Sequence, residues 1–230
     1  MQSDKKQIVV MGASRGIGAA VARHFAHKGD RVFSISRNPP VAGKWIQADV
    51  STSEGIELVA NTIGDEFRLD ALLFMGGVWE DAAFTEKYNF MASSDLETRY
   101  VIAVNTIAPI ELTKQLADNL AKSNNPRAVF IGSLSGLDNS ASIEVANTAS
   151  KFGLRGAAQA LKLALRDRKI GVTVINPGNV ATEEVLADIE EGRFSQQVPI
   201  PLTDIISTIE WILTLSNTVD VGDINLQQKI

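Results

Sequence analysis

Short apolar runs typical of β-strands alternate with longer helix-like stretches along the whole chain. The strand-like runs span residues 7–11, 31–36, 44–48, 70–75, 127–132, 171–176 and 222–226, and the helix-like stretches span residues 16–28, 53–66, 94–122, 146–168 and 203–215. This alternation is typical of a parallel sheet, because each parallel connection needs a crossover, and crossovers are right-handed. We therefore predict an α/β fold with a doubly wound, parallel sheet of about seven strands and helices on both faces.

The length of 230 residues suits one large domain, so residues 1–230 are expected to form a single unit. Hydrophobic residues make up 45% of the chain, yet no apolar run approaches the roughly 18 residues that a membrane helix needs. The N-terminus leads into a strand without the apolar core of a secretion signal. A cytoplasmic protein without a membrane partner is therefore expected.

Charge and side-chain chemistry exclude several classes of site. The chain has no cysteine, which rules out disulfides, thiolate metal sites and cysteine nucleophiles. His24 and His27 lie three residues apart on the first predicted helix, but no third metal ligand is close in sequence, so no metal site is predicted. The net charge is −5 and no basic tract is present, which argues against nucleic acid as a partner.

A glycine-rich turn follows the first predicted strand. Residues 8–18 contain an apolar run and then Gly12, Gly16 and Gly18, directly before an Ala- and Val-rich helix. Glycines let a ligand approach the backbone, and the free N–H groups of a helix start attract anions. The turn therefore predicts a phosphate or pyrophosphate site; a glycine-rich turn that binds nothing is the alternative.

Three irregular segments follow the fourth, fifth and sixth predicted strands, at residues 77–93, 133–145 and 177–202. Ligands of doubly wound sheets bind outside the carboxyl ends of the strands. These segments are therefore expected to surround the ligand.

The turn resembles the cofactor turn of the short-chain dehydrogenase/reductase family, whose pattern is Thr-Gly-x-x-x-Gly-x-Gly. Met11 stands here in place of the usual threonine. The resemblance extends over almost the whole chain and implies a Rossmann-type domain that binds a nicotinamide dinucleotide. The residues that it places at the cofactor are Gly12, Ser14, Arg15, Gly16, Ile17, Gly18, Arg37, Asp49, Val50, Gly76, Gly77, Lys151, Pro177, Gly178, Val180 and Thr182.

Two arginines bear on the choice of dinucleotide. Arg37 follows the second strand, where an NAD-preferring enzyme would place an acidic residue, and Arg15 lies within the glycine turn. A guanidinium can bind the 2′-phosphate of NADP(H) with two hydrogen bonds, and basic residues at both positions accompany NADP(H) preference in the family. The sequence therefore favours NADP(H) over NAD(H), although either arginine can also be a solvated surface residue.

The other cofactor segments match the family to different degrees. Asp49-Val50 matches a family step whose carboxylate holds the adenine amino group, and an aspartate here also suits a helix cap. Gly76-Gly77 ends a segment where the family has Asn-Asn-Ala-Gly, so only backbone contacts are expected there. Residues 177–182 match the Pro-Gly-x-x-x-Thr turn that holds the nicotinamide amide.

The family's catalytic tetrad is Asn, Ser, Tyr and Lys, and three members have counterparts. Asn105 matches the asparagine that holds a water in the proton relay. Ser133, with Ser135 as a close rival, matches the serine that orients the substrate oxygen. Lys151 matches the lysine that binds the nicotinamide ribose and lowers the pKa of the tyrosine.

The tyrosine itself is replaced by Asn147, one helical turn before Lys151. An amide forms hydrogen bonds but does not donate a proton as a phenol does. Tyr88 reaches the site only if its loop folds over it. Glu144, three residues before Asn147, could also face the substrate, but it is expected to be a solvated loop carboxylate. Asn147, or a water beside it, would then have to take the place of the acid.

Two functions remain open. One is an NADP(H)-dependent oxidoreductase that acts on a carbonyl or alcohol of a small-molecule substrate, and the other is an NADP(H)-binding protein with little or no turnover. An asparagine introduced to trap a complex is a third explanation of position 147.

The stretch from Glu183 to Phe194 resembles the family's mobile substrate lid. Members usually pair through helices matching 94–122 and 146–168, so a homodimer or homotetramer is expected.

Overall fold

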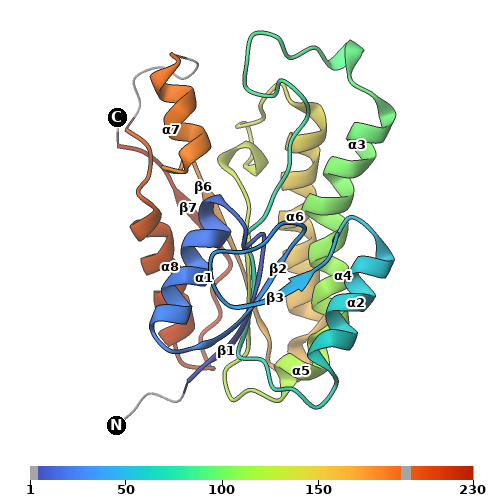
Figure 1. Cartoon of the computed structure of the whole chain (residues 1–230), viewed down its shortest axis with the longest axis vertical. Helices are drawn as coiled ribbons and strands as arrows, with labels where there is room; N and C mark the ends of the chain where they lie inside the picture. The colour runs from blue at the N-terminus through green and yellow to red at the C-terminus, as the bar shows by residue number, and fades with distance from the viewer. Residues whose placement is uncertain (1–4, 193–197, 230) are drawn as a thin grey trace.

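The protein is built on a parallel β-sheet, shown in the computed structural model of Figure 1, which describes residues 5–192 and 198–229. Its seven strands lie in the order β3-β2-β1-β4-β5-β6-β7, and all neighbours are parallel. Their bounds are β1 (Gln7–Met11), β2 (Arg31–Ser36), β3 (Lys44–Gln47), β4 (Ala71–Phe74), β5 (Arg127–Ile131), β6 (Gly171–Pro177) and β7 (Asp223–Leu226). The predicted seven-stranded, doubly wound sheet is confirmed.

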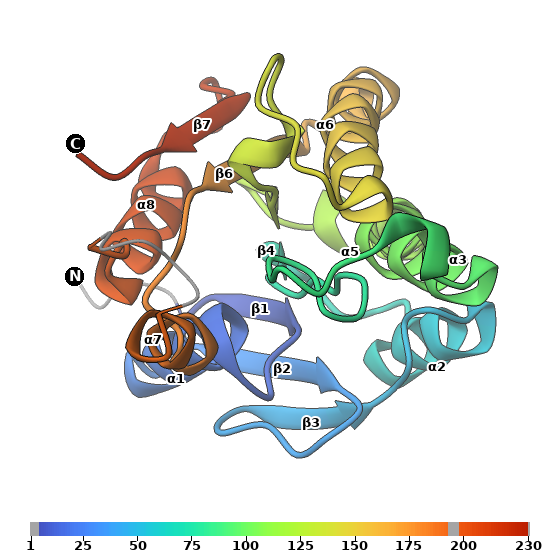
Figure 2. The ribbon, with the colours of Figure 1, turned by 90° about the horizontal axis from the view of Figure 1, so that it is seen from above.

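Helices cover both faces of the sheet, as the view from above shows (Figure 2). One face carries α1 (Gly16–His27) and α8 (Leu202–Thr214), with α7 (Glu183–Glu190) on the same side. The opposite face carries α2 (Ser53–Ile63), α3 (Asp95–Ile102), α4 (Ala108–Gln115), α5 (Ala117–Ala121) and α6 (Val145–Ala164). Short 3₁₀ turns lie at Phe90–Ala92, Leu134–Gly136 and Arg166–Arg168.

The alternation of side chains along each strand explains the two layers. In β1, Ile8 and Val10 pack toward Phe25 of α1, whereas Val9 belongs to the cluster that also contains Leu112 of α4. Successive side chains of a strand point to opposite faces, so a strand that is apolar throughout is buried on both. The sheet is thereby fixed between two hydrophobic cores.

The predicted helix over residues 94–122 is wrong in one respect, because the structure divides it. A π-helical turn, Ala103–Ile107, separates α3 from α4, and Leu116, whose backbone is not helical, separates α4 from α5. The π turn contains Asn105, whose side chain is buried and hydrogen-bonded outside its own helix. Such local widening of a helix often lies at functional positions.

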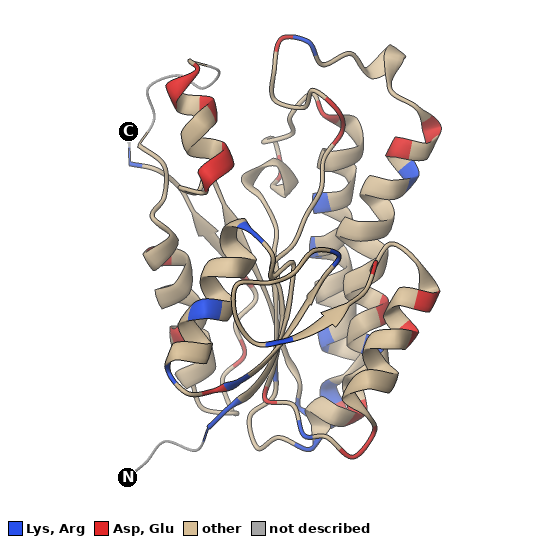
Figure 3. Cartoon of the chain, viewed as in Figure 1, with Lys and Arg blue, Asp and Glu red and all other residues tan. Residues whose placement is uncertain are grey.

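Acidic and basic residues are spread along many helices and loops of the chain (Figure 3). Helix α7 is acidic at its start, with Glu183 and Glu184 in its first turn and no basic residue in its last. Among the described residues, no helix combines the length and the apolar character that crossing a membrane would require.

Candidate active site

A cavity of about 540 Å³ opens at the carboxyl ends of the strands, at the point where the strand order reverses between β1 and β4. Most of the predicted site residues line it. They are Gly12, Ser14, Arg15, Gly16, Ile17, Arg37, Asp49, Val50, Gly76, Gly77, Ser133, Asn147, Lys151, Pro177, Gly178, Val180 and Thr182. Gly18 and Asn105 are the two predicted residues that do not line the cavity.

The glycine turn forms one wall of the cavity by backbone packing. Gly12 has a φ of +84° and Gly16 a φ of +55°, a region that other residues rarely adopt. A Cβ atom on Gly18 would lie 2.1 Å from the carbonyl oxygen of Gly12. Gly18 is therefore required to pack α1 against the end of β1, although it does not face the cavity.

The start of α1 leaves backbone N–H groups available to an anion. Arg15 precedes the helix without a side-chain cap, and the first turn contains no acidic residue. Unpaired N–H groups and the positive end of the helix dipole favour a phosphate at such a position. This geometry suits the pyrophosphate of a dinucleotide.

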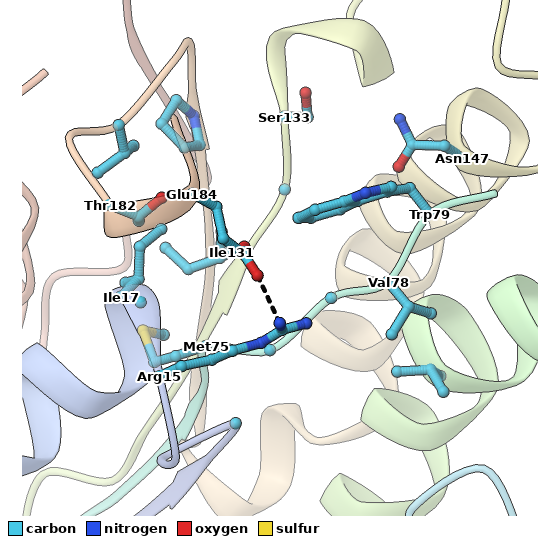
Figure 4. A pocket seen from close by; sticks show the side chains of 18 of the residues that line it. Arg15, Ile17, Met75, Val78, Trp79, Ile131, Ser133, Asn147, Thr182 and Glu184 are labelled. Atoms are coloured by element: carbon cyan, nitrogen blue, oxygen red, sulfur yellow. Dashed lines mark ion pairs between the residues drawn. The ribbon is translucent and has the colours of Figure 1, made fainter. Parts of the chain in front are cut away.

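The two arginines have different surroundings. Arg15 forms an ion pair with Glu184 at the start of α7, and both side chains line the cavity (Figure 4). Arg37 directly follows β2, and its guanidinium lies 5.8 Å from the centre of the Tyr100 ring. Asp49 accepts a hydrogen bond from the Ser51 N–H at 2.9 Å, but the residue that caps α2 is Thr52, whose hydroxyl accepts from the Gly55 N–H at 3.1 Å.

Asn147 and Lys151 lie one turn apart on α6, and both side chains are buried at the cavity wall. The Lys151 ammonium donates a hydrogen bond to the Ile131 carbonyl at 3.2 Å. Burial lowers the pKa of Lys151 from its ordinary 10.5 to about 8, because the charged form is poorly solvated there. Burial thus brings the pKa of Lys151 well below that of an exposed lysine.

Two serines face this part of the cavity. The Ser135 hydroxyl donates a hydrogen bond to the Ser133 hydroxyl at 2.9 Å, and the Ser135 N–H does so at 3.2 Å. Ser133 directly follows β5, so the strand and the 3₁₀ turn fix its position. The predicted rivals are therefore neighbours in one hydrogen-bonded pair.

Asn105 lies behind the cavity wall and holds the segment that follows β4. Its Oδ1 atom accepts from the Val78 N–H at 2.9 Å, and its Nδ2 group donates to the Val78 carbonyl at 2.7 Å. A second Nδ2 hydrogen bond reaches the Ser150 hydroxyl at 3.0 Å. Asn105 therefore holds the backbone of Val78 in place, whereas its predicted hydrogen bond to a relay water stays a prediction.

The loop after β4 supplies wall residues that the sequence did not identify. Trp79 and Phe84 line the cavity, and the Trp79 indole extends into it beside Asn147 (Figure 4). No motif marks these two side chains. The only sequence signal is their position after Gly76 and Gly77, which follow β4, within a segment already expected to surround the ligand.

Tyr88 and Glu144 lie near the start of α6, but neither lines the cavity. The Tyr88 hydroxyl accepts a hydrogen bond from the Val145 N–H at 3.2 Å. Glu144 is 2% exposed and accepts from the Phe84 N–H at 2.8 Å. The prediction of a solvated Glu144 is wrong, because the folded loop covers its carboxylate.

Helix α7 begins against the glycine turn. The Thr182 hydroxyl caps this helix by accepting from the Val185 N–H at 3.4 Å. A Cβ atom on Gly16 would lie 3.5 Å from the Thr182 methyl group. The predicted nicotinamide-binding turn thus lies beside the predicted phosphate-binding turn, and the Arg15–Glu184 ion pair joins the two segments. Phe194, the end of the predicted lid, lies outside the described residues.

The model of the short chain dehydrogenase family matches residues 6–192. The 3-oxoacyl-[acyl-carrier-protein] reductase FabG of Escherichia coli is 30% identical over 213 residues, which cover 86% of this chain and 84% of that protein. The short-chain dehydrogenase/reductase olcF of Penicillium canescens is 26% identical over 211 residues, covering 88% and 79%. A solved structure of 4-hydroxyisoleucine dehydrogenase complexed with NADH superposes with a TM-score of 0.78 at 26% identity and covers 97% of each chain.

The lowered pKa of Lys151 predicts a specific dependence of stability on pH. Between about pH 8 and pH 10.5 the unfolded chain holds this proton and the folded chain has released it, so stability must rise with pH in this window. Urea unfolding of the wild type and of Lys151→Met at pH 7, 9 and 10 isolates the effect. The free energy of unfolding of the wild type should rise relative to that of the variant above pH 8. A difference that stays constant with pH would contradict the buried, weakly solvated ammonium.

Proposed function

The chain belongs to the short-chain dehydrogenase family, and on that premise we propose that it is an NADP(H)-dependent oxidoreductase acting on a carbonyl or alcohol of a small molecule. The observation that carries the proposal is the cavity, in which the glycine turn, Thr182 and Lys151 surround one space. When bound, the dinucleotide would supply or accept the hydride. The protein's own residues would bind it, orient the substrate and exchange the proton.

The cavity walls fit such a dinucleotide. The N–H groups at the start of α1 would hold the pyrophosphate, and Asp49 would lie at the adenine end. Thr182 and the Pro177-Gly178 turn would hold the nicotinamide amide, with Lys151 at its ribose. These residues reach the same cavity from the ends of β1, β3 and β6 and from α6.

The preference for NADP(H) rests on charge. Among the described cavity-lining residues, the cations are Arg15, Arg37 and Lys151. Arg15 is already paired with Glu184, and Lys151 lies buried on α6, so Arg37 is the best candidate for a 2′-phosphate. The similar 4-hydroxyisoleucine dehydrogenase was solved with NADH, the dinucleotide that lacks this phosphate.

Proton exchange is the step for which this site is unusual. At the position that we assign to the family's tyrosine, Asn147 offers a carboxamide without a transferable proton. The buried Lys151 ammonium, one turn further along α6, also lines the cavity, and its Nζ atom lies 3.4 Å from where a Cβ atom on Gly77 would be. We propose slow turnover, in which Lys151 and a water beside Asn147 deliver the proton.

The alternative is an NADP(H)-binding protein that does not turn its cofactor over. The specific observation in its favour is again Asn147, because the described cavity wall contains no tyrosine in contact with it. Tyr100 lies at the Arg37 end, and Tyr88 lies outside the cavity. In this alternative Lys151 and the glycines would serve binding alone.

Arg37→Ala is predicted to weaken NADPH binding at least about tenfold more than NADH binding, because only NADPH carries the 2′-phosphate. Fluorescence titration of both dinucleotides measures the two dissociation constants. Arg23→Ala is the matched control, because Arg23 is exposed on α1 and does not line the cavity. An equal loss of affinity for NADPH and for NADH would contradict the assignment of Arg37 to the 2′-phosphate.

Asn147→Tyr is predicted to raise the rate of carbonyl reduction by about 10²-fold or more, since a positioned general acid contributes about 10²- to 10⁴-fold. Asn147→Phe has nearly the same size without the hydroxyl, and its rate should not rise. NADPH consumption and alcohol formation are measured together over a panel of ketones. Product formed by Asn147→Tyr but none by the wild type would favour the cofactor-binding alternative, and equal rates for the Tyr and Phe variants would contradict the role assigned to position 147.

A further inference from the structure

Two large aromatic side chains are left partly exposed inside the cavity. Trp79 is 46% exposed and Phe84 is 38% exposed, and their ring centres lie 6.0 Å apart in an edge-to-face arrangement. Figure 4 shows the indole projecting from the loop after β4 toward the space between Asn147 and Ser133. Exposed aromatic rings in a concave site typically mark a surface that contacts a ligand.

The backbone on both sides of Trp79 is held in place. On one side, the Asn105 amide binds both the N–H and the carbonyl of Val78. On the other side, the Glu80 carboxylate is 2% exposed and accepts hydrogen bonds from the first N–H groups of α6, at 2.6 Å from Ala146 and 3.2 Å from Asn147. The indole is thus carried by a residue whose two neighbours are both fixed.

A reciprocal contact fixes Phe84. The Glu144 carboxylate, which directly precedes α6, accepts a hydrogen bond from the Phe84 N–H. Phe84 has a φ of +62° and Ala82 a φ of +54°, conformations that are strained for side-chain-bearing residues. The loop reaches α6 through Glu80 and α6 reaches the loop through Glu144; we call this pair of contacts the Glu80–Glu144 latch.

This arrangement opposes the stability of the fold. Two carboxylates are buried, neither forms a salt bridge with any described residue, and two aromatic rings remain partly in solvent. The N–H groups and dipole of α6 offset part of the charge on Glu80. A rigid aromatic surface in a binding site gives a functional reason for such an arrangement.

The charges and side chains near the two rings indicate the kind of ligand. The cavity lining includes the apolar side chains of Ala83, Leu134 and Val185, whereas Arg15 and Arg37 lie at the dinucleotide end. The lining also includes the acidic Glu184 and Asp188 of α7, of which Glu184 is paired with Arg15. Apart from the buried Lys151, the described part of this wall offers no cation to pair with a carboxylate or phosphate on the substrate. A flat, uncharged molecule therefore fits this end best.

We propose that Trp79 and Phe84 form a preformed aromatic platform for a flat, uncharged aromatic or conjugated carbonyl compound, and that the Glu80–Glu144 latch positions this platform. The inference rests on the proposed function, because the substrate would lie on the rings with its carbonyl toward Ser133 and Asn147. Stacking on an indole face favours a flat ring beyond its buried area. Because the latch already orders the loop, binding loses little conformational entropy.

The test compares three probes that share one skeleton. These are 2-acetylnaphthalene, its saturated counterpart 2-acetyldecalin, and the anionic 6-acetyl-2-naphthoate, each titrated calorimetrically into the full chain saturated with NADP⁺. The wild type should bind the naphthalene at least about tenfold more tightly than the other two. Trp79→Leu should remove most of that preference, whereas Trp211→Leu, which changes an exposed tryptophan on α8, should leave it unchanged.

Equal affinity for the flat and saturated ketones, or a preference that survives Trp79→Leu, would overturn the platform. Tighter binding of the naphthoate would overturn the selection for an uncharged ligand. The NADP⁺ titration that precedes each experiment separates the two proposals, because absence of NADP⁺ binding contradicts the proposed function, whereas NADP⁺ binding without ring preference contradicts only the platform.

Glu80→Gln tests the latch as a positioning element. In this variant an amide replaces the carboxylate that accepts hydrogen bonds from two N–H groups of α6. The ratio of the affinity for 2-acetylnaphthalene to that for 2-acetyldecalin should therefore fall toward the ratio measured for the Trp79→Leu variant. Thermal unfolding monitored by circular dichroism is recorded alongside. A lower melting temperature with an unchanged affinity ratio would show that Glu80 has only a structural role.

Discussion

The cavity depends on backbone packed directly against backbone at three glycines. A Cβ atom on Gly12 would lie 2.6 Å from the Gly76 Cα, and one on Gly18 would lie 2.1 Å from the Gly12 carbonyl oxygen. Through these contacts the end of β1, the end of β4 and the start of α1 come together without any side chain between them. The floor of the cavity is therefore polar backbone at the point where the strand order reverses, which is the usual ligand position in doubly wound sheets.

The opposite wall is organised by α6 rather than by the sheet. The first N–H groups of α6 bind Glu80, and its second turn carries Lys151 against the end of β5. Asn105 completes the arrangement from the π-helical turn by holding the segment next to Trp79. Because one helix carries Asn147, Lys151 and the contact to the loop, the proposed proton-transfer group and the aromatic platform keep a fixed relation to each other.

The sequence predicted the architecture well because strand and helix periodicities are local properties. The seven strands lie close to the predicted positions, and most predicted cofactor residues share one cavity. The π-helical turn at Ala103–Ile107 was missed because apolar residues continue through it, whereas the contact that accompanies it, between Asn105 and Val78, joins distant parts of the chain. The burial of Glu144 was missed for a similar reason, since its partner Phe84 lies 60 residues away and no motif marks the contact. Long-range polar contacts of this kind leave no periodic signal in a single sequence.

The most direct test of the account is a crystal structure of the chain soaked or crystallised with NADP⁺. The account predicts the pyrophosphate on the N–H groups at the start of α1, the 2′-phosphate against Arg37, and the nicotinamide between Thr182 and Lys151, facing Asn147. A dinucleotide bound with its 2′-phosphate away from Arg37, or absent from this cavity at saturating concentration, would contradict it.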